Sequence, residues 1–273
     1  MVATPIGNLL DITLRALETL KKASAIAAED TRVTARLLSH YGLSTPLFSI
    51  RQEARGAQAI IHRLAAGEKV ALVSDAGTPL LSDPGARIVQ EVRQAGFAVV
   101  PIPGPSSLTS ALCVSGAEGP FLFLGFLPAR PAARQKLLQE VAALPYALVC
   151  YEAPHRIAQS LEDLAAFLGG ERKLAFCREL TKVHETVRVL TVGELRAWIR
   201  EDSDQQRGEM VLVIHPPSGE GLEKKREKEM EKILSTLLRE LSLSRAVEVC
   251  ALVTSLPKNK IYEKALFLER HGR

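Results

Sequence analysis

The sequence predicts an α/β protein made of two α/β domains, with a ligand cleft at the edge of a sheet and a small helical module after the two domains. Three observations predict this class. Short apolar runs alternate with amphipathic helical patterns through most of the chain, which is typical of βαβ units in a doubly wound sheet. Loops of small residues follow two successive predicted strands, at residues 74–79 and 103–107. A linker rich in proline and glycine at residues 216–221 precedes a last helical segment.

Composition sets the outer limits of this prediction. The chain has 273 residues, of which 47% are hydrophobic, enough for two cores. Its formal net charge of +4 permits an anionic partner without requiring one. The four cysteines are widely spaced in apolar runs without metal-ligand spacing, so we expect reduced core thiols, a cytoplasmic protein and no metal site. No apolar run reaches membrane-spanning length and no signal-peptide pattern is present, so no membrane association is predicted.

The first predicted domain covers residues 1–120. A short strand at residues 1–3 leads to helix signals from Asp11, with an apolar stripe of Leu14, Leu17 and Leu20. Asp30 is expected to cap a helix at 31–40 that follows a strand at 25–28. The remaining predicted elements are a helix at 57–66, a strand at 69–73, a helix at 84–95 with Asp83 as N-cap and Pro84 at its first position, a strand at 98–102 and a helix at 106–115.

The second predicted domain covers residues 121–217, and the helical module covers residues 218–273. The second domain is expected to contain strands at 121–127, 146–151, 172–178, 185–192 and 209–214, and helices at 132–143, 155–168 and 193–201. Two strands in succession predict antiparallel pairing within a mixed sheet. In the module, a mixed-charge helix is expected at 223–231. A helix from Ser242, a break at Leu256-Pro257 and a helix from Lys258 favour a helix-turn-helix, although a helical packing module fits this stretch equally well.

The two loops of small residues predict a binding cleft. Loops that follow neighbouring parallel strands should lie side by side, where their main-chain groups can hold a small polar ligand. For a single loop of this kind, an ordinary βα connection is the alternative. The sequence lacks a Gly-x-Gly-x-x-Gly fingerprint and a Gly-Lys-Ser/Thr phosphate loop, which argues against ordinary dinucleotide binding and against a phosphate-binding regulator. Tyr151 and Glu152, at the end of a strand of the second domain, are expected to close the cleft.

Several ordered motifs together resemble one family. They lie at residues 4–13, 28–32, 74–79, 103–106, 151–156, 178–182 and 208–211. With the helical tail, they are similar to the branch of the tetrapyrrole-methylase (class III) superfamily that methylates 16S ribosomal RNA, and the resemblance covers almost the whole chain. Members of that family have several more apolar residues before the Thr-Pro-Ile-Gly motif, so the first strand of this chain is expected to be short.

This resemblance implies S-adenosylmethionine bound in the cleft between the two domains. The implied reaction is methyl transfer to the ribose 2′-hydroxyl of a cytidine in the decoding region of 16S rRNA, by a homodimer. The residues that the loops and the motifs assign to cofactor binding are Pro5, Asp75, Ala76, Gly77, Thr78, Ser106, Ser107, Tyr151, Glu152, Glu209 and Met210.

Catalysis would require alignment of donor and acceptor and removal of the hydroxyl proton. The candidate proton acceptors are Glu179, Lys182 and Glu185 from the second domain and Asp30 from the first. Lys182 could act as a base only if its pKa were lowered by burial or by neighbouring cations, and a charged Lys182 would instead hold a phosphate. A surface ion-pair cluster is the alternative for the group around Glu179.

Candidate RNA contacts are Arg32, Arg130, His155, Arg156, Lys258 and Lys260. Packing or simple exposure explains each of these side chains equally well. Two other functions fit the same chain: C-methylation of a tetrapyrrole, and RNA binding without catalysis. The basic helical tail favours an RNA substrate over a macrocycle, and the cleft argues against a purely binding role.

Overall fold

The computed structural model describes residues 1–50, 53–81, 85–218, 227, 230–254 and 256–271. The chain divides into two compact units. The larger unit contains Met1–Ala142 and Tyr146–Pro216, and the smaller unit contains Ala143–Pro145 and Pro217–Arg273. The larger unit holds two β-sheets. The domain boundary predicted at residue 120 falls inside this unit and stays a prediction.

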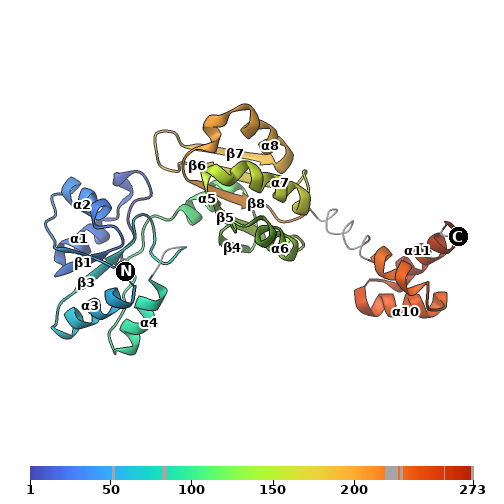
Figure 1. Ribbon diagram of the computed structural model, residues 1–273, viewed down its shortest axis with the longest axis horizontal. Coiled ribbons are helices and arrows are strands. Elements are labelled where there is room, and N and C mark those ends of the chain that lie inside the picture. Colours follow the sequence, from blue (N-terminus) through green and yellow to red (C-terminus); the bar gives the residue numbers. More distant parts are fainter. Residues whose placement is uncertain (51–52, 82–84, 219–226, 228–229, 255, 272–273) are drawn as a thin grey trace. The chain divides into compact units, whose positions relative to one another are not determined.

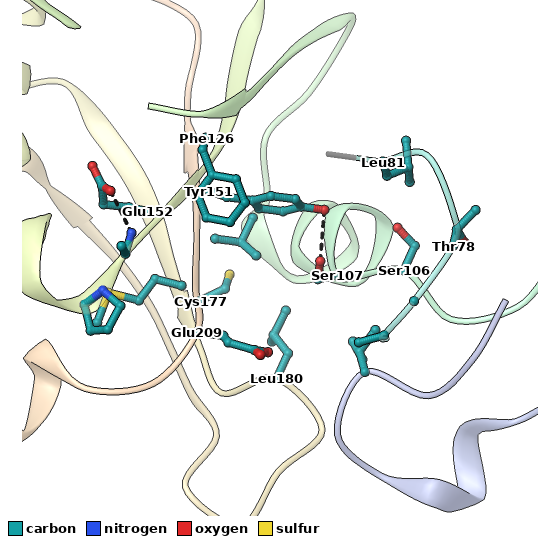
Figure 2. Close-up of a pocket in the computed structure, with 17 residues that line it drawn as sticks. Thr78, Leu81, Ser106, Ser107, Phe126, Tyr151, Glu152, Cys177, Leu180 and Glu209 are labelled. Atoms are coloured by element: carbon teal, nitrogen blue, oxygen red, sulfur yellow. Dashed lines mark hydrogen bonds between the residues drawn. The ribbon is translucent and has the colours of Figure 1, made fainter. Parts of the chain in front are cut away.

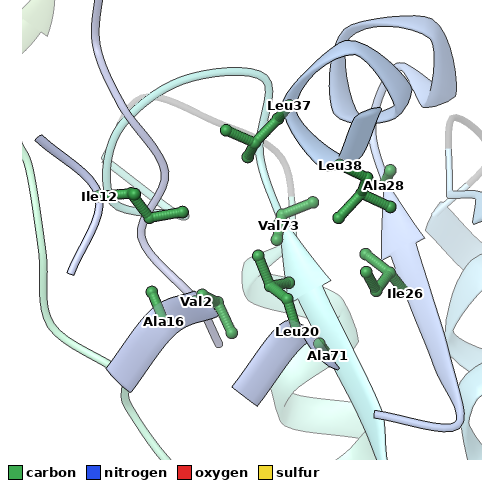
Figure 3. Packing of buried hydrophobic residues seen from close by; sticks show 10 residues of the cluster. All are labelled: Val2, Ile12, Ala16, Leu20, Ile26, Ala28, Leu37, Leu38, Ala71 and Val73. Carbon is green, nitrogen blue, oxygen red and sulfur yellow. The ribbon is translucent and has the colours of Figure 1, made fainter. Parts of the chain in front are cut away.

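The first sheet is parallel, with strand order β2-β1-β3, and its strands are β1 (Ala25–Ala28), β2 (Leu47–Ser49) and β3 (Val70–Val73). Successive residues of a strand face opposite sides of a sheet. Ile26, Ala28 and Val73 therefore pack with α1 (Leu14–Lys22) and α2 (Thr31–His40), as Figure 3 shows. Ala27 and Leu72 pack with α3 (Glu53–Ala65) and α4 (Ala86–Gln94). These two helices lie on the other side of the sheet (Figure 1). The predicted doubly wound arrangement is confirmed for this sheet.

The strand predicted at residues 98–102 is wrong. In this stretch only Ile102 forms a β-bridge, and its partner is Val2. The Ile102 amide donates to Met1 O at 2.8 Å, and Ala3 N donates to Ile102 O at 3.2 Å. Pro101 and Pro103 flank Ile102 and have no N–H to continue a ladder. The strand predicted at residues 1–3 is short, as expected, because only Val2 within it forms a β-bridge.

Other predictions for the first domain need smaller corrections. A 3-10 turn (η1, Leu9–Asp11) precedes α1, whose N-cap is Thr13. Leu14 is 86% exposed, so the predicted stripe is wrong there, and Ala16 shares the buried face with Leu20. Helix α3 begins earlier than predicted, and the three-residue strand β2 was missed because so short a run has no periodicity. Asp83 and Pro84 lie outside the described residues, and α4 follows an N-cap at Gly85.

The second sheet is mixed, as predicted, with strand order β4-β5-β8-β6-β7. Its strands are β4 (Phe121–Phe126), β5 (Ala147–Glu152), β6 (Lys173–Arg178), β7 (Thr186–Thr191) and β8 (Met210–Ile214). Strands β4 and β5 are parallel, whereas β8 is antiparallel to both β5 and β6, and β6 and β7 form an antiparallel pair. All five residues of the central strand β8 are buried.

Helix α5 (Ser107–Ser115) covers one face of the second sheet, although it precedes the boundary predicted at residue 120. Its Leu108 and Ala111 join a core with Val149, Ala175 and Val211. Three further helices belong to this part of the chain: α6 (Pro131–Val141), α7 (Ile157–Leu168) and α8 (Val192–Glu201), with 3-10 turns η2 (Pro154–Arg156) and η3 (Ser203–Gln206). Helix α8 contacts β6 and β7, and its Trp198 meets Phe176 edge-on at 5.8 Å between ring centroids.

The smaller unit contains α10 (Leu243–Thr254) and α11 (Lys258–His271), which confirms the helix, break and helix predicted around Leu256-Pro257. Its core includes Met230, Leu234, Cys250 and Ile261. In the helix predicted at 223–231, residues 227, 230 and 231 are helical, and the other six positions lie outside the described residues. No helix in the described part of the chain is long and apolar enough to cross a membrane.

Candidate functional site

A cavity of about 290 Å³ opens in the larger unit where the first sheet's loops meet the second sheet (Figure 2). Its walls come from the N-terminal loop, the loop after β3, the start of α5, the C-terminal ends of β4, β5 and β6, and the start of β8. The lining residues are Ile6, Ala76, Gly77, Thr78, Leu81, Ser106, Ser107, Phe126, Tyr151, Glu152, Ala153, Pro154, Cys177, Leu180, Glu209, Met210 and Val211. The wall is therefore mostly apolar with a few polar groups, which is typical of small-molecule sites.

The two loops of small residues do lie side by side. The Thr78 hydroxyl donates a hydrogen bond to Pro105 O at 3.0 Å. Gly77 and Thr4 exchange main-chain hydrogen bonds at 2.9 and 3.0 Å. Gly77 has φ +75°, and an added Cβ would lie 3.2 Å from Ile6 Cγ2. Because both its left-handed conformation and its close neighbour disfavour a side chain, this approach of the loops depends on glycine.

Ser106 presents an unused polar group to the cavity. It is the N-cap residue of α5, but its side chain makes no capping bond. Its hydroxyl is buried and has no hydrogen-bond partner among the described residues. The first amides of α5 have no carbonyl partner within the helix. A buried hydroxyl and free amides at one point fit a ligand that brings polar groups of its own.

Tyr151 and Glu152 end β5 at the cavity. The Ser107 hydroxyl donates to Tyr151 Oη at 3.0 Å and so joins α5 to β5. The Glu152 side chain is fully buried and forms an ion pair with Arg156 at 2.6 Å. Its carboxylate also accepts hydrogen bonds from Ala153 N at 2.6 Å and from the Ser160 hydroxyl. Both carboxylate oxygens of Glu152 are therefore engaged by protein groups.

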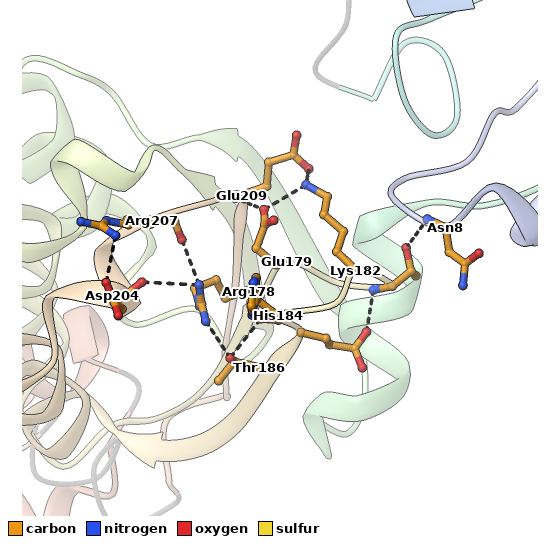
Figure 4. A network of polar contacts seen from close by, with 11 residues as sticks. Asn8, Arg178, Glu179, Lys182, His184, Thr186, Asp204, Arg207 and Glu209 are labelled. Carbon is orange, nitrogen blue, oxygen red and sulfur yellow. Dashed lines mark hydrogen bonds and ion pairs between the residues drawn. The ribbon is translucent and has the colours of Figure 1, made fainter. Parts of the chain in front are cut away.

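Glu179, Lys182 and Glu209 form a polar cluster beside the cavity (Figure 4). Lys182 Nζ lies 2.9 Å from a Glu179 oxygen and 3.1 Å from a Glu209 oxygen. Burial alone would lower the pKa of Lys182, but its hydrogen bonds and charge interactions with both glutamates outweigh burial and raise it. Burial alone would raise the pKa of Glu179, but hydrogen bonds from Glu209 N and Lys182, with the Lys182 and Arg178 charges, lower it. The cluster therefore holds a protonated lysine between two carboxylates at neutral pH.

The loop after β6, which carries Glu179 and Lys182, also contacts the N-terminal loop. Asn8 N donates to Thr181 Oγ1 at 3.0 Å, and Thr181 N donates to Glu185 at 2.6 Å. A Cβ added to Gly7 would lie 2.5 Å from Lys182 Cγ. Glu179 and Thr181 have φ values of +51° and +67°, a conformation that costs a residue with a side chain free energy and that clusters at functional sites.

The cavity collects most of the predicted cofactor-binding residues. Pro5 and Asp75 are the two that do not line it. Asp75 instead accepts a hydrogen bond from Asp30 N at 2.8 Å. Asp30 caps α2 through Arg32 N, as predicted, and its carboxylate also pairs with the Arg32 side chain. Of the four predicted proton acceptors, Glu179 and Lys182 are in direct contact, and Glu185 lies on their loop. Asp30 lies apart from them, in contact with Asp75 and Arg32.

Sequence reasoning missed several lining residues, including Phe126, Cys177 and Leu180. Phe126 ends β4, Cys177 is the next-to-last residue of β6, and Leu180 follows β6. The strand order places these ends at the cavity, and the sequence alone does not give that order. Burial, with a smaller contribution from the Glu185 charge, raises the pKa of the Cys177 thiol to about 12. Cys150 and Cys250 are also buried, but Cys113 is exposed, so the prediction of a core thiol is wrong for Cys113.

The predicted RNA contacts occupy different surroundings. Arg130, His155 and Lys258 are exposed. Arg32 pairs with Asp30, Arg156 pairs with buried Glu152, and Lys260 pairs with Glu227 at 2.6 Å.

Comparison with known proteins gives two family matches. Residues 1–196 match the model for Tetrapyrrole (Corrin/Porphyrin) Methylases. Residues 225–269 match the RsmI C-terminal HTH domain. Similar curated proteins include Ribosomal RNA small subunit methyltransferase I of Vibrio cholerae serotype O1, 45% identical over 97% of this chain and 93% of that protein. The protein of the same name from Escherichia coli O157:H7 is 43% identical over 97% and 93%.

Solved structures show the same fold at low sequence identity. The methyltransferase CobJ has a TM-score of 0.60 and 19% identity, covering 79% of this chain and 92% of that one. Diphthine synthase has a TM-score of 0.60 and 15% identity, covering 78% and 88%. At these identities the likeness establishes the two-sheet fold of the larger unit and nothing about substrate.

Proposed function

Since the chain belongs to the ribosomal RNA small subunit methyltransferase I family, within the tetrapyrrole methylases, we propose that it methylates the ribose 2′-hydroxyl of a cytidine in the decoding region of 16S rRNA. S-adenosylmethionine is the proposed methyl donor, and the enzyme is proposed to act as a homodimer. Two features favour an RNA substrate over a tetrapyrrole: the family of the similar curated proteins and the match of residues 225–269 to a helix-turn-helix domain.

The cavity beside α5 is proposed to hold the cofactor, and Ser106 is the observation that carries this proposal. Its buried hydroxyl has no partner among the described residues, and leaving such a group unsatisfied costs about 1–3 kcal/mol. A polar ligand in the cavity would recover that free energy. The neighbouring residues Ala76 and Gly77 line the same cavity, and their small size lets a ligand approach the main chain closely.

When bound, the cofactor would supply a methyl group that is already activated by its positive sulfur. The protein's remaining task is to position the ribose hydroxyl and to accept its proton. The raised pKa of Lys182 argues against Lys182 as the base, because its ammonium is protonated at neutral pH. We assign it instead to orienting a carboxylate.

Glu209 is the carboxylate we propose as the proton acceptor. It lines the cavity, and its side chain is 75% exposed while one oxygen contacts Lys182 at 3.1 Å. Glu179 contacts the same ammonium but does not line the cavity. Substitution Glu209→Gln should lower kcat by about a hundredfold or more and leave cofactor affinity nearly unchanged.

The experiment that tests the function is methyl transfer from labelled S-adenosylmethionine to purified small subunits that lack the modification, with mapping of the labelled nucleotide. Label on a base, or on no RNA at all, would refute the proposal.

Calorimetry tests the cofactor site separately. Ser106→Ala should weaken S-adenosylmethionine binding by about 2- to 13-fold, the value of one hydrogen bond, and Ser106→Phe should abolish binding. Ser110→Ala is the matched control, because Ser110 lies one turn further along α5 and does not line the cavity. Equal affinity in Ser106→Ala and Ser110→Ala would remove Ser106 from the site.

A further inference from the structure

Strand β4 contains a bulge that changes the direction of its last side chain. Phe121, Leu122 and Phe123 pair in regular register with Ala147, Leu148 and Val149. The register then shifts, and Phe126 pairs with Tyr151. Leu124 and Gly125 together therefore oppose Cys150, and Gly125 has φ +66°. An extra residue with a left-handed glycine is the usual construction of a bulge that re-aims a side chain.

The bulge places the Phe126 side chain on the face of the sheet that also carries Phe123, whereas regular pairing would place it on the opposite face. Residues three apart in a regular strand point to opposite faces of the sheet. The extra residue puts Phe126 on the same face as Phe123, and Tyr151 contacts both rings edge-on, with centroids 5.1 and 5.3 Å away. Figure 2 shows Phe126 beside Tyr151, across the cavity from Thr78 and Ser106.

Phe126 is held at its edge and remains open on the rest of its surface. Tyr151 is fixed by the hydrogen bond from Ser107, so its ring offers a firm support. Phe126 nevertheless stays 54% exposed while lining the cavity. A single exposed phenylalanine is ordinary on a protein surface, but here a local backbone distortion places it at a cavity mouth.

We propose that Phe126 is a stacking platform for a nucleobase of the RNA substrate at the mouth of the cavity. This inference rests on the proposed function and deepens it, because it names the part of the substrate that the rim recognises. A nucleotide must leave its stack before its ribose can enter a cavity. An aromatic ring that receives a base offsets part of the lost stacking, in a way that tolerates different base sequences.

Two sources could supply a planar base here: the RNA and the adenine of the cofactor. The RNA is favoured because the ring is at the exposed rim, whereas Ser106 and the small-residue loop lie on the opposite wall. An arginine and a histidine flank the same rim in sequence. Arg130 is exposed four residues after Phe126, and His155 is exposed next to the lining residue Pro154. Such groups favour a phosphate backbone outside the cavity.

The test compares three substitutions of Phe126 with one matched control. Phe126→Trp keeps a planar ring, Phe126→Leu keeps apolar bulk without a plane, and Phe126→Ala removes both. Phe121→Ala is the control, because Phe121 is 48% exposed on the same strand and does not line the cavity. Each variant is assayed for methyl transfer to unmodified small subunits, for calorimetric S-adenosylmethionine binding and for filter binding of short single-stranded RNA.

Stacking predicts that Phe126→Ala and Phe126→Leu raise the KM for the subunit, and the Kd for single-stranded RNA, by about 5- to 150-fold. Phe126→Trp and Phe121→Ala should stay within about threefold of the unsubstituted protein, and cofactor affinity should be unchanged in all four variants. Wild-type RNA binding by Phe126→Leu would overturn the proposal. Loss of cofactor affinity in Phe126→Ala would assign the ring to adenine instead.

Two further outcomes are distinguishable. If Phe126→Ala changed the molecular mass in solution and left RNA binding intact, a second copy of the chain would be the occupant of this face, and the proposal would fail. If the unsubstituted protein methylated no subunit RNA, the proposed function would fail. The filter-binding ratio between Phe126→Leu and Phe126→Trp would still decide whether the ring stacks on a base.

Discussion

Replacement of Glu152 by alanine should destabilise the larger unit and thereby show that this residue builds the cavity wall. The Glu152 carboxylate is buried and contacts Arg156, Ala153 N and the Ser160 hydroxyl. Ser160 is fully buried, and the Arg156 side chain is 16% exposed. Removal of the carboxylate would leave these donors without their acceptor, and breaking a buried pair in this way costs about 3–5 kcal/mol.

That free energy corresponds to a large thermal shift. In a unit of this size, 1 kcal/mol lowers Tm by about 2–4 °C, so Glu152→Ala should lower Tm by about 6–20 °C. Glu152→Gln keeps the shape but loses the charge. At about 1.5–3 kcal/mol for hydrogen bonds to a charged group, it should lower Tm by about 3–12 °C.

Calorimetric unfolding measures both shifts, and Glu209→Ala is the matched control. Glu209 lines the same cavity but is 75% exposed, so its loss should move Tm by no more than about 2 °C. If Glu152→Ala unfolded within that margin of the unsubstituted protein, the reasoning would be refuted. The same holds if Glu152→Gln lost cofactor affinity at an unchanged Tm, since the carboxylate would then face the ligand.

Four other outcomes are expected. Alkylation of the native protein at neutral pH should modify exposed Cys113 and spare Cys177, whose pKa burial raises to about 12; mass spectrometry that found Cys177 labelled first would contradict this. Lys182→Arg should retain methyl transfer and Lys182→Met should lose it, and no lysine titration should appear near neutral pH in the rate profile because the pKa of Lys182 is raised. The lowered pKa of Glu179 means that the stability from its ionisation is complete above the ordinary glutamate range and disappears as pH falls through the folded value; Glu179→Gln should therefore weaken the dependence of Tm on pH at the acid end. Removal of residues 222–273 should weaken binding to the small subunit and leave S-adenosylmethionine affinity nearly intact, and equal rRNA methylation by the shortened chain would refute an RNA role for the smaller unit.

Patterns of four or more residues made much of the fold predictable. The alternation of apolar strands and helices predicted β1, β3, β5, β6 and β8, and the small-residue loops predicted the contact that Thr78 makes with Pro105. Local chemistry also predicted the cap at Asp30. The prediction of a strand at residues 98–102 was wrong because it rested on hydrophobicity alone. Pro101 and Pro103 lack the amide hydrogens that a strand needs for its ladder of hydrogen bonds.

The side-chain environment of the site was less predictable. The sequence alone does not distinguish Glu152 from Glu209. The Glu152 carboxylate is buried and contacts three protein groups, whereas the Glu209 side chain is largely exposed. The same holds for Phe126, whose direction depends on a register shift against β5. The packing of strands and helices decides protonation, burial and orientation, and a single sequence does not record that packing.

The position of α5 has a consequence for how the protein can be divided. Leu108 and Ala111 shield Val149, Ala175 and Val211, which belong to three strands of the second sheet. A fragment that began at residue 121 would expose that apolar surface to water, and one that ended at residue 120 would carry an unpacked helix. Each half expressed separately should therefore aggregate, and solubility should be restored only when the two halves are expressed together.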